Sequence, residues 1–193
     1  MKRQDSRARL LDAAFAEVYK HGYHGTGTAV ILKAAGVPKG SMYHFFASKK
    51  ELVLAVSQER IVPKMDDFFD FARLPDETIF QTFARVFAKM KAHDILIANG
   101  CPLHRLLVEM APLDPDFEAV LSKAYHHFID KLSQALEAAI ADGELQAFDT
   151  KAFARFFITS TWGEISLPPA LSSKTSFGHH TQYLTIVLEH YRK

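Results

Sequence analysis

Apolar residues recur at helical spacing along almost the whole chain, and this pattern restricts the fold more than any other feature. The alternating runs of β-branched residues that are typical of half-buried strands are missing. The sequence therefore predicts an all-α protein of about nine helices. Pro63 is expected to kink or split the fourth helix, and Pro168-Pro169 to end the eighth. The expected ranges are 10–21, 29–35, 39–46, 49–71, 75–93, 102–110, 116–142, 150–165 and 175–191.

The first fifty residues are expected to form three short helices joined by tight turns. Gly22 and Gly36 stand at helix ends, where a residue in the left-handed conformation is favoured. A threonine of the turn 25–28 can cap the second helix, and Pro38 suits the start of the third. Two short helices joined by the turn 34–38 match a helix-turn-helix, whose second helix lies in the major groove of DNA.

The third expected helix, 39–46, has two chemically different faces. Met42, Phe45 or Phe46 can pack in a small core, which leaves the polar side chains outside. A recognition helix reads base edges with its N-terminal residues, while neighbouring side chains and helix N-termini hold phosphates. We therefore expect DNA contacts from eight residues: Thr26, Thr28, Lys39, Gly40, Ser41, Tyr43, His44 and Lys49.

The formal net charge of +1 conceals a strong asymmetry along the chain. Residues 1–50 contain nine Lys and Arg but three Asp and Glu, a net charge of +6. The remaining 143 residues contain 14 basic and 19 acidic side chains, together with 13 of the 16 Phe. A basic head and an acidic, Phe-rich body indicate an anionic partner for the head and a separate role for the body. The alternative is chance variation of surface charge.

Four stretches of the N-terminal part together resemble the DNA-binding domain of the TetR (TetR/AcrR) family of transcriptional regulators: Leu10–Ala14, Gly22–Thr26, Ala34–Phe46 and Ser48–Leu52. The resemblance implies that the first three helices bind operator DNA and that the last two form a homodimer. It divides the chain into a helix-turn-helix domain, 1–50, and a helical effector-binding and dimerisation domain, 51–193. Paired heads of this kind read a near-palindrome whose half-sites lie about one helical turn apart.

The family resemblance also implies a repressor that leaves the operator when a small effector binds the body. An aromatic-lined cavity with few polar groups would suit an apolar or aromatic compound. Candidate polar groups are His104, Glu109, Tyr125, Trp162 and Glu164. The alternative is that the Phe side chains are simply core, and that Trp162 and Glu164 face solvent or a dimer partner.

Cys101 is the only cysteine, so the chain cannot form an intramolecular disulfide. It is expected at a helix start, where the helix dipole lowers a thiol pKa, with His104 and Arg105 three and four residues later. The Gly100-Cys101 pair resembles one branch of the family, in which some members respond to electrophiles or oxidants through such a thiol. The lysine that some of those sensors use is missing from 167–171, although Lys174 lies nearby. The alternative is a small buried apolar cysteine.

Other functional classes find little support in the sequence. The zinc-protease HExxH pattern, a Gly-rich phosphate loop and a nucleophile elbow are all missing, so we expect no enzyme activity, metal or cofactor. No apolar run approaches the roughly 18 residues of a membrane span, and no signal peptide is visible, so we expect a cytoplasmic protein without membrane contact. A rival hypothesis is a helical effector-binding or enzymatic bundle that retains the head as a structural element.

Overall fold

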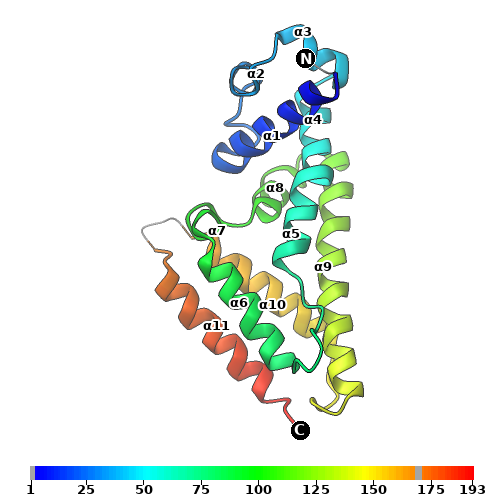
Figure 1. Ribbon diagram of the computed structural model, residues 1–193, viewed down its shortest axis with the longest axis vertical. Helices are drawn as coiled ribbons and strands as arrows, with labels where there is room; N and C mark the ends of the chain where they lie inside the picture. The colour runs from blue at the N-terminus through cyan, green and yellow to red at the C-terminus, as the bar shows by residue number, and fades with distance from the viewer. Residues whose placement is uncertain (1–2, 168–170) are drawn as a thin grey trace. The chain divides into compact units, whose positions relative to one another are not determined.

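The computed structural model describes residues 3–167 and 171–193, and within these ranges the chain is helical. The described residues form no strand, and the pair Leu145 and Arg192 makes an isolated bridge. The prediction of an all-α fold is confirmed. The elements are α1 Arg3–His21, α2 Thr28–Ala35, α3 Lys39–Phe45, α4 Lys49–Val56, η1 Ser57–Ile61, α5 Val62–Phe68, α6 Ile79–Ala92, α7 Asp94–Asn99, α8 Pro102–Met110, α9 Pro115–Ala141, α10 Thr150–Ile165 and α11 Lys174–Glu189 (Figure 1).

The predicted fourth helix is split, as expected, but by a π-helical segment that precedes Pro63. In η1 the amide of Val62 donates to the carbonyl of Ser57, five residues earlier. Proline has no amide hydrogen, and its ring crowds the carbonyl four residues before it. A wider turn just before Pro63 accommodates this defect while the helical direction continues into α5. The residues Pro168-Pro169, expected to end the eighth helix, lie outside the described residues.

Two further local expectations need correction. The turn before α2 does not use a threonine cap, because Gly27 occupies the N-cap position without a side-chain hydrogen bond and Thr28 is already helical. The short helix α7 was not expected from the sequence. Its N-cap is His93, whose Nδ1 accepts a hydrogen bond from the amide of Leu96 at 3.0 Å. Histidine is not among the residues preferred at N-caps, so the sequence did not indicate a helix start here.

The chain divides into two compact units. The first contains the residues up to Met65 together with Pro102–Ala124, and the second contains Asp66–Cys101 together with Tyr125–Lys193. In the first unit, α1 packs against α2 and α4. Its buried core is small and apolar, as binary patterning along each amphipathic helix predicts. The core residues include Leu11, Ala14, Ile31, Met42, Leu52 and Val56.

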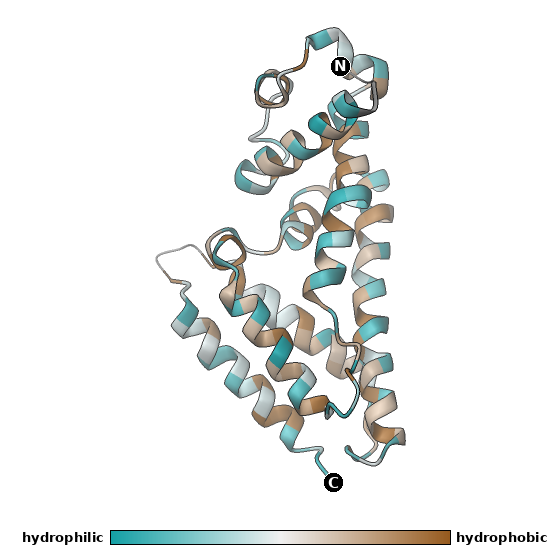
Figure 2. Ribbon diagram, viewed as in Figure 1, coloured by the Kyte–Doolittle hydropathy of each residue, from teal (hydrophilic) through white to brown (hydrophobic). Residues whose placement is uncertain are grey.

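In the second unit, α11 packs against both α6 and α10 (Figure 1). Hydrophobic and hydrophilic residues alternate along these helices in Figure 2, as expected for helices with one buried face. A cluster of four buried Phe side chains fills the unit's interior: Phe71, Phe83, Phe87 and Phe157. In five pairs of these rings the centroids lie 5.0 to 5.9 Å apart, which is contact distance for aromatic rings. No helix in the described part of the chain is long and apolar enough to cross a membrane.

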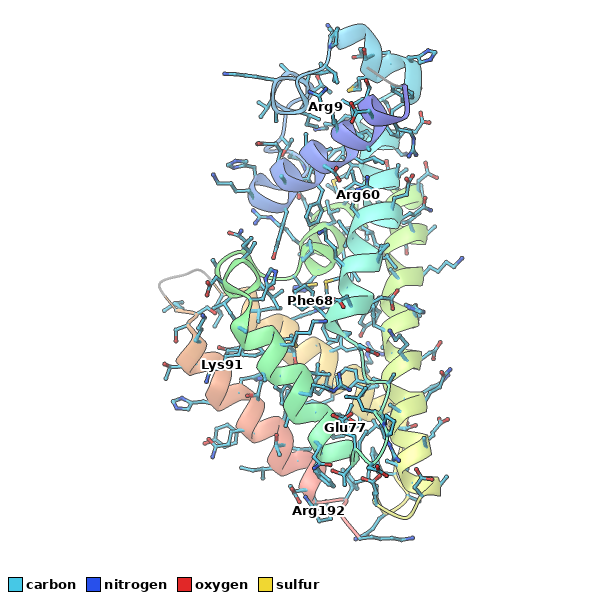
Figure 3. All side chains as sticks on the ribbon, viewed as in Figure 1. Arg9, Arg60, Phe68, Glu77, Lys91 and Arg192 are labelled. Atoms are coloured by element: carbon cyan, nitrogen blue, oxygen red, sulfur yellow. The ribbon has the colours of Figure 1, made fainter. Side chains whose placement is uncertain are left out.

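Glu77, labelled in Figure 3, is held by several hydrogen bonds just before α6. Its carboxylate accepts from Arg85 Nε at 2.9 Å, from the amide of Leu74 at 3.0 Å and from the Thr82 hydroxyl at 3.0 Å. Arg85 contributes most to lowering the pKa of Glu77 from 4.5 to about 2; burial opposes the shift. The folded state therefore favours the charged carboxylate. This preference stabilises the folded state at any pH at which Glu77 is also charged in the unfolded chain.

Replacing Glu77 with Gln is expected to destabilise the protein at pH 7 by removing this network. Because the pKa of Glu77 is lower in the folded state, the stabilisation is fully present above about pH 4.5 and is lost as the pH falls toward 2. The difference in urea midpoint between wild type and Glu77→Gln should therefore shrink steadily below pH 4.5. A difference that stays constant between pH 7 and pH 3 would contradict this account.

Candidate nucleic-acid interface

The turn between α2 and α3 has the geometry that a helix-turn-helix requires. Gly36 ends α2 in the left-handed conformation with φ of +61°, as the sequence predicted. Its carbonyl accepts a hydrogen bond from Arg9 Nη2 at 3.1 Å (Arg9 is labelled in Figure 3). Pro38 follows with extended backbone and precedes the first residue of α3. Glycine thus allows the sharp turn, and α1 holds the turn through Arg9.

Helix α3 buries one side and exposes the other. Met42 and the following Phe46 are buried, so of the two phenylalanines considered it is Phe46 that completes the core. Tyr43 is 51% exposed, and Lys39 and His44 are also exposed. A cleft of about 410 Å³ runs along this outward side, lined by Ser6, Gly40, Ser41, His44 and Phe45. A Cβ on Gly40 would meet no atom within 4 Å, so the backbone is open to a ligand there.

Two of the remaining expected DNA contacts, Thr26 and Lys49, make hydrogen bonds inside the head. Thr26 is 1% exposed, and its hydroxyl donates to the carbonyl of Gly22 at 2.7 Å. Lys49 Nζ donates to the carbonyls of Tyr23 and Thr26 at 3.0 and 3.1 Å. Burial lowers the pKa of Lys49, and the charge of Glu109 opposes that shift. Thr28 is half-buried in the first turn of α2.

The structure distributes the seven expected effector or sensor residues over both units. His104, Arg105 and Glu109 lie in the first unit, whereas Cys101, Tyr125, Trp162 and Glu164 lie in the second. Arg105 Nη1 donates to the carbonyl of Tyr19 at 3.3 Å, and Glu109 binds the segment after α1. Both residues therefore contact the head, which the sequence did not suggest.

In the second unit, the structure brings two of the expected residues together. The rings of Tyr125 and Trp162 lie 5.3 Å apart. Oε1 of the half-buried Glu164 is shielded from solvent without a hydrogen-bond partner. Cys101 is 1% exposed, which agrees with the alternative to a sensor thiol, a small buried apolar side chain. Burial lowers the pKa of His104, which disfavours the positively charged ring that was expected near the start of α8.

Helices α10 and α11 leave large apolar side chains exposed. Tyr183, Ile186 and Val187 share one face of α11, since they are spaced three and four residues apart, and Phe156 is exposed on α10. The two helices pack against each other, and large apolar side chains left exposed on adjacent helices are typical of a surface that a partner covers. These four residues are called the α10/α11 face below.

Comparison with known proteins gives matches over both parts of the chain. Residues 10–56 match the family model for bacterial regulatory proteins of the tetR family, and residues 78–184 match the tetracyclin repressor-like C-terminal domain. The transcriptional regulator AcuR of Cereibacter sphaeroides is 31% identical over 188 residues, covering 89% of this chain and 83% of AcuR. The repressor NemR of Escherichia coli K12 is 27% identical over 137 residues, covering 69% of this chain and 68% of NemR.

Solved structures agree with this assignment at the level of the fold. A TetR transcriptional regulator from Chloroflexus aurantiacus superposes with a TM-score of 0.86 at 24% identity, covering 99% of this chain and 98% of that one. The reduced form of E. coli NemR gives a TM-score of 0.83 at 21% identity, covering 95% and 97%. With a helix-turn-helix head and both family domains matched, the chain belongs to the TetR family of DNA-binding transcriptional regulators and is not an enzyme.

Proposed function

We propose that the protein reads its operator with the outward side of α3, lying in the major groove. The observation that carries this proposal is the exposure of Lys39, Gly40, Tyr43 and His44 on a helix whose opposite side is buried. Ser41 lies half-buried beside them along the cleft. Thr28, at the start of α2, would hold a phosphate, whereas Thr26 and Lys49 would act by fixing the turn before α2.

In this proposal residues 1–50 bind DNA, and residues 51–193 bind the effector and form the dimer. Two copies would pair through the α10/α11 face of each and present two heads to a near-palindromic operator in the cytoplasm. The protein would act as a repressor that an effector releases. For release, the effector must favour a conformation in which the two recognition helices no longer fit successive major grooves.

The proposed effector is a small apolar or aromatic compound bound in the second unit. Tyr125 and Trp162 offer aromatic surface, and the buried Oε1 of Glu164 can accept a hydrogen bond from a ligand donor. A thiol-reactive effector would instead have to reach Cys101, which is 1% exposed. Reaction of Cys101 with a maleimide only above about pH 8 would indicate an ordinary thiol and exclude the sensor alternative.

Binding to DNA that flanks the protein's own gene is expected to weaken steeply with salt, because Lys and Arg contacts to phosphate release counterions. Tyr43→Ala should lower the affinity by roughly 10- to 100-fold if the ring contacts a base, since good base contacts contribute about 1–3 kcal/mol. Lys39→Ala should weaken binding to all sequences and reduce the salt slope by about one. Fluorescence-anisotropy titrations at several salt concentrations measure both effects.

Lys123→Ala is the matched control, because Lys123 is also exposed but lies on α9 outside the proposed interface. Its affinity and salt slope should equal those of the wild type. If Tyr43→Ala and Lys39→Ala also bound like the wild type, α3 would not be the reading helix. Turnover of a small molecule by purified protein, unaffected by both substitutions, would favour the rival enzymatic bundle.

A further inference from the structure

Helix α8 belongs to the matched C-terminal domain but packs in the same compact unit as the DNA-binding head. Ion pairs and a ring contact, that of Tyr23 with Phe117, join Pro102–Ala124 to the head. Lys50, for example, lies 2.7 Å from both Asp114 and Asp116 on the surface, where such pairs contribute little. Arg105 of α8 makes a single hydrogen bond of 3.3 Å to the backbone carbonyl of Tyr19. One further contact differs, because it ties an α8 side chain to two backbone amides of the head at once.

That contact is made by the carboxylate of Glu109, whose two oxygens each bind one backbone amide. Oε2 accepts from the amide of Tyr23 at 2.8 Å, and Oε1 accepts from the amide of His24 at 2.8 Å. Oε1 also lies 3.0 Å from Nδ1 of His24. Charge-assisted bonds of this kind are stronger than neutral ones and fix the position of both partners.

The chain between α1 and α2 is shaped to receive this carboxylate. Gly22 ends α1 with φ of +77°, and a Cβ at this position would lie 2.8 Å from Oε2 of Glu109. A larger residue would therefore strain the backbone and displace the carboxylate. Burial raises the pKa of Glu109, but the bonds from His24 and Tyr23 outweigh it and leave the pKa below its usual value. Glu109 is thus a carboxylate at neutral pH.

We propose that Glu109 is a positioning residue for operator binding, which it supports by holding the turn between α1 and α2 on α8. The turn leads directly into α2 and α3, so its orientation sets the direction of the recognition helix. A movement of α8 away from the turn must break both amide bonds together. The inference rests on the proposed function of α3 and adds the residue through which the C-terminal domain controls it.

Glu109→Gln tests this role because it preserves the shape of the side chain but leaves one acceptor for two amides. The amides of Tyr23 and His24 should exchange hydrogen faster, and the dissociation constant for operator DNA should rise about tenfold as the competent fraction of heads falls. The salt slope should stay unchanged, because no phosphate contact is lost. Hydrogen exchange with mass spectrometry and anisotropy titration on the full-length protein give these readouts.

Two further variants separate positioning from a general loss of stability. Glu118→Gln, at an exposed position of α9, should leave exchange and affinity unchanged. Gly22→Ala should reproduce the loss of affinity by displacing the intact carboxylate. The double variant with Glu109→Gln should lose little more affinity than either single variant, because both substitutions act on one contact. Measurements are made at a temperature where circular dichroism shows every variant to be folded.

The outcomes distinguish the inference from the proposed function. If wild type binds the operator and Glu109→Gln binds equally well, Glu109 is not a positioning residue, although α3 still reads DNA. The same conclusion holds if Glu109→Gln lowers only the melting temperature. If the wild type binds no DNA that flanks its gene, this result contradicts the proposed function itself, on which the inference rests. A tenfold loss with an unchanged salt slope supports the inference.

Discussion

Ile186→Glu is expected to convert the protein into a monomer and to lower operator affinity by at least about a hundredfold. Ile186 is 55% exposed in a single chain, and it lies on α11 between Tyr183 and Val187. In the proposed dimer, this face is covered by the same face of a second copy, an arrangement typical of two-fold interfaces. A glutamate there would place an unpaired charge in an apolar contact, which costs several kcal/mol.

The loss of DNA affinity follows from the loss of pairing. Two linked heads bind one operator with an effective concentration that raises affinity by roughly 10²–10⁴ over a single head. Sedimentation velocity measures the oligomeric state, and anisotropy titration measures the affinity. Ala119→Glu provides the control, since it adds the same charge at an exposed position of α9 and should remain dimeric. A dimeric Ile186→Glu protein would show that α11 does not form the interface.

Features set by neighbouring residues could be predicted from the sequence. The left-handed ends at Gly22 and Gly36 appear as expected, because a glycine that follows an amphipathic run carries its own conformational signal. The start of α3 after Pro38 and the burial of Met42 are equally local. For this reason the all-α fold and the outward side of α3 could be predicted without the structure.

Features that depend on distant residues could not be predicted. Glu109 was expected to line an effector cavity, because in the sequence it is a polar residue among apolar neighbours. Its partners are two backbone amides 85 and 86 residues away. Almost every residue has a backbone amide, so the sequence does not indicate which amides a distant carboxylate will bind. Arg105 was likewise expected beside Cys101, but it donates to the carbonyl of Tyr19. The choice between Phe45 and Phe46 also depended on tertiary packing, which buries Phe46.

The Phe-rich composition had two possible meanings, a packed core or an aromatic effector cavity, and Phe157→Ala distinguishes them. Phe157 is fully buried, with ring centroids of Phe71, Phe83 and Phe87 at 5.5, 5.4 and 5.7 Å. If these rings form a closed core, removing one leaves a cavity and lowers the free energy of unfolding by about 3–5 kcal/mol.

Urea unfolding of Phe157→Ala at one fixed protein concentration measures this loss, since the stability of a dimer depends on concentration. Leu74→Ala is the control, because Leu74 is exposed and its replacement should change stability by less than about 0.5 kcal/mol. A new cavity lined by Phe side chains would stay dry and bind a benzene-sized compound, which should restore part of the stability. A loss below about 1 kcal/mol would instead mean that Phe157 borders space already open in the wild type, where an aromatic effector could bind without any substitution.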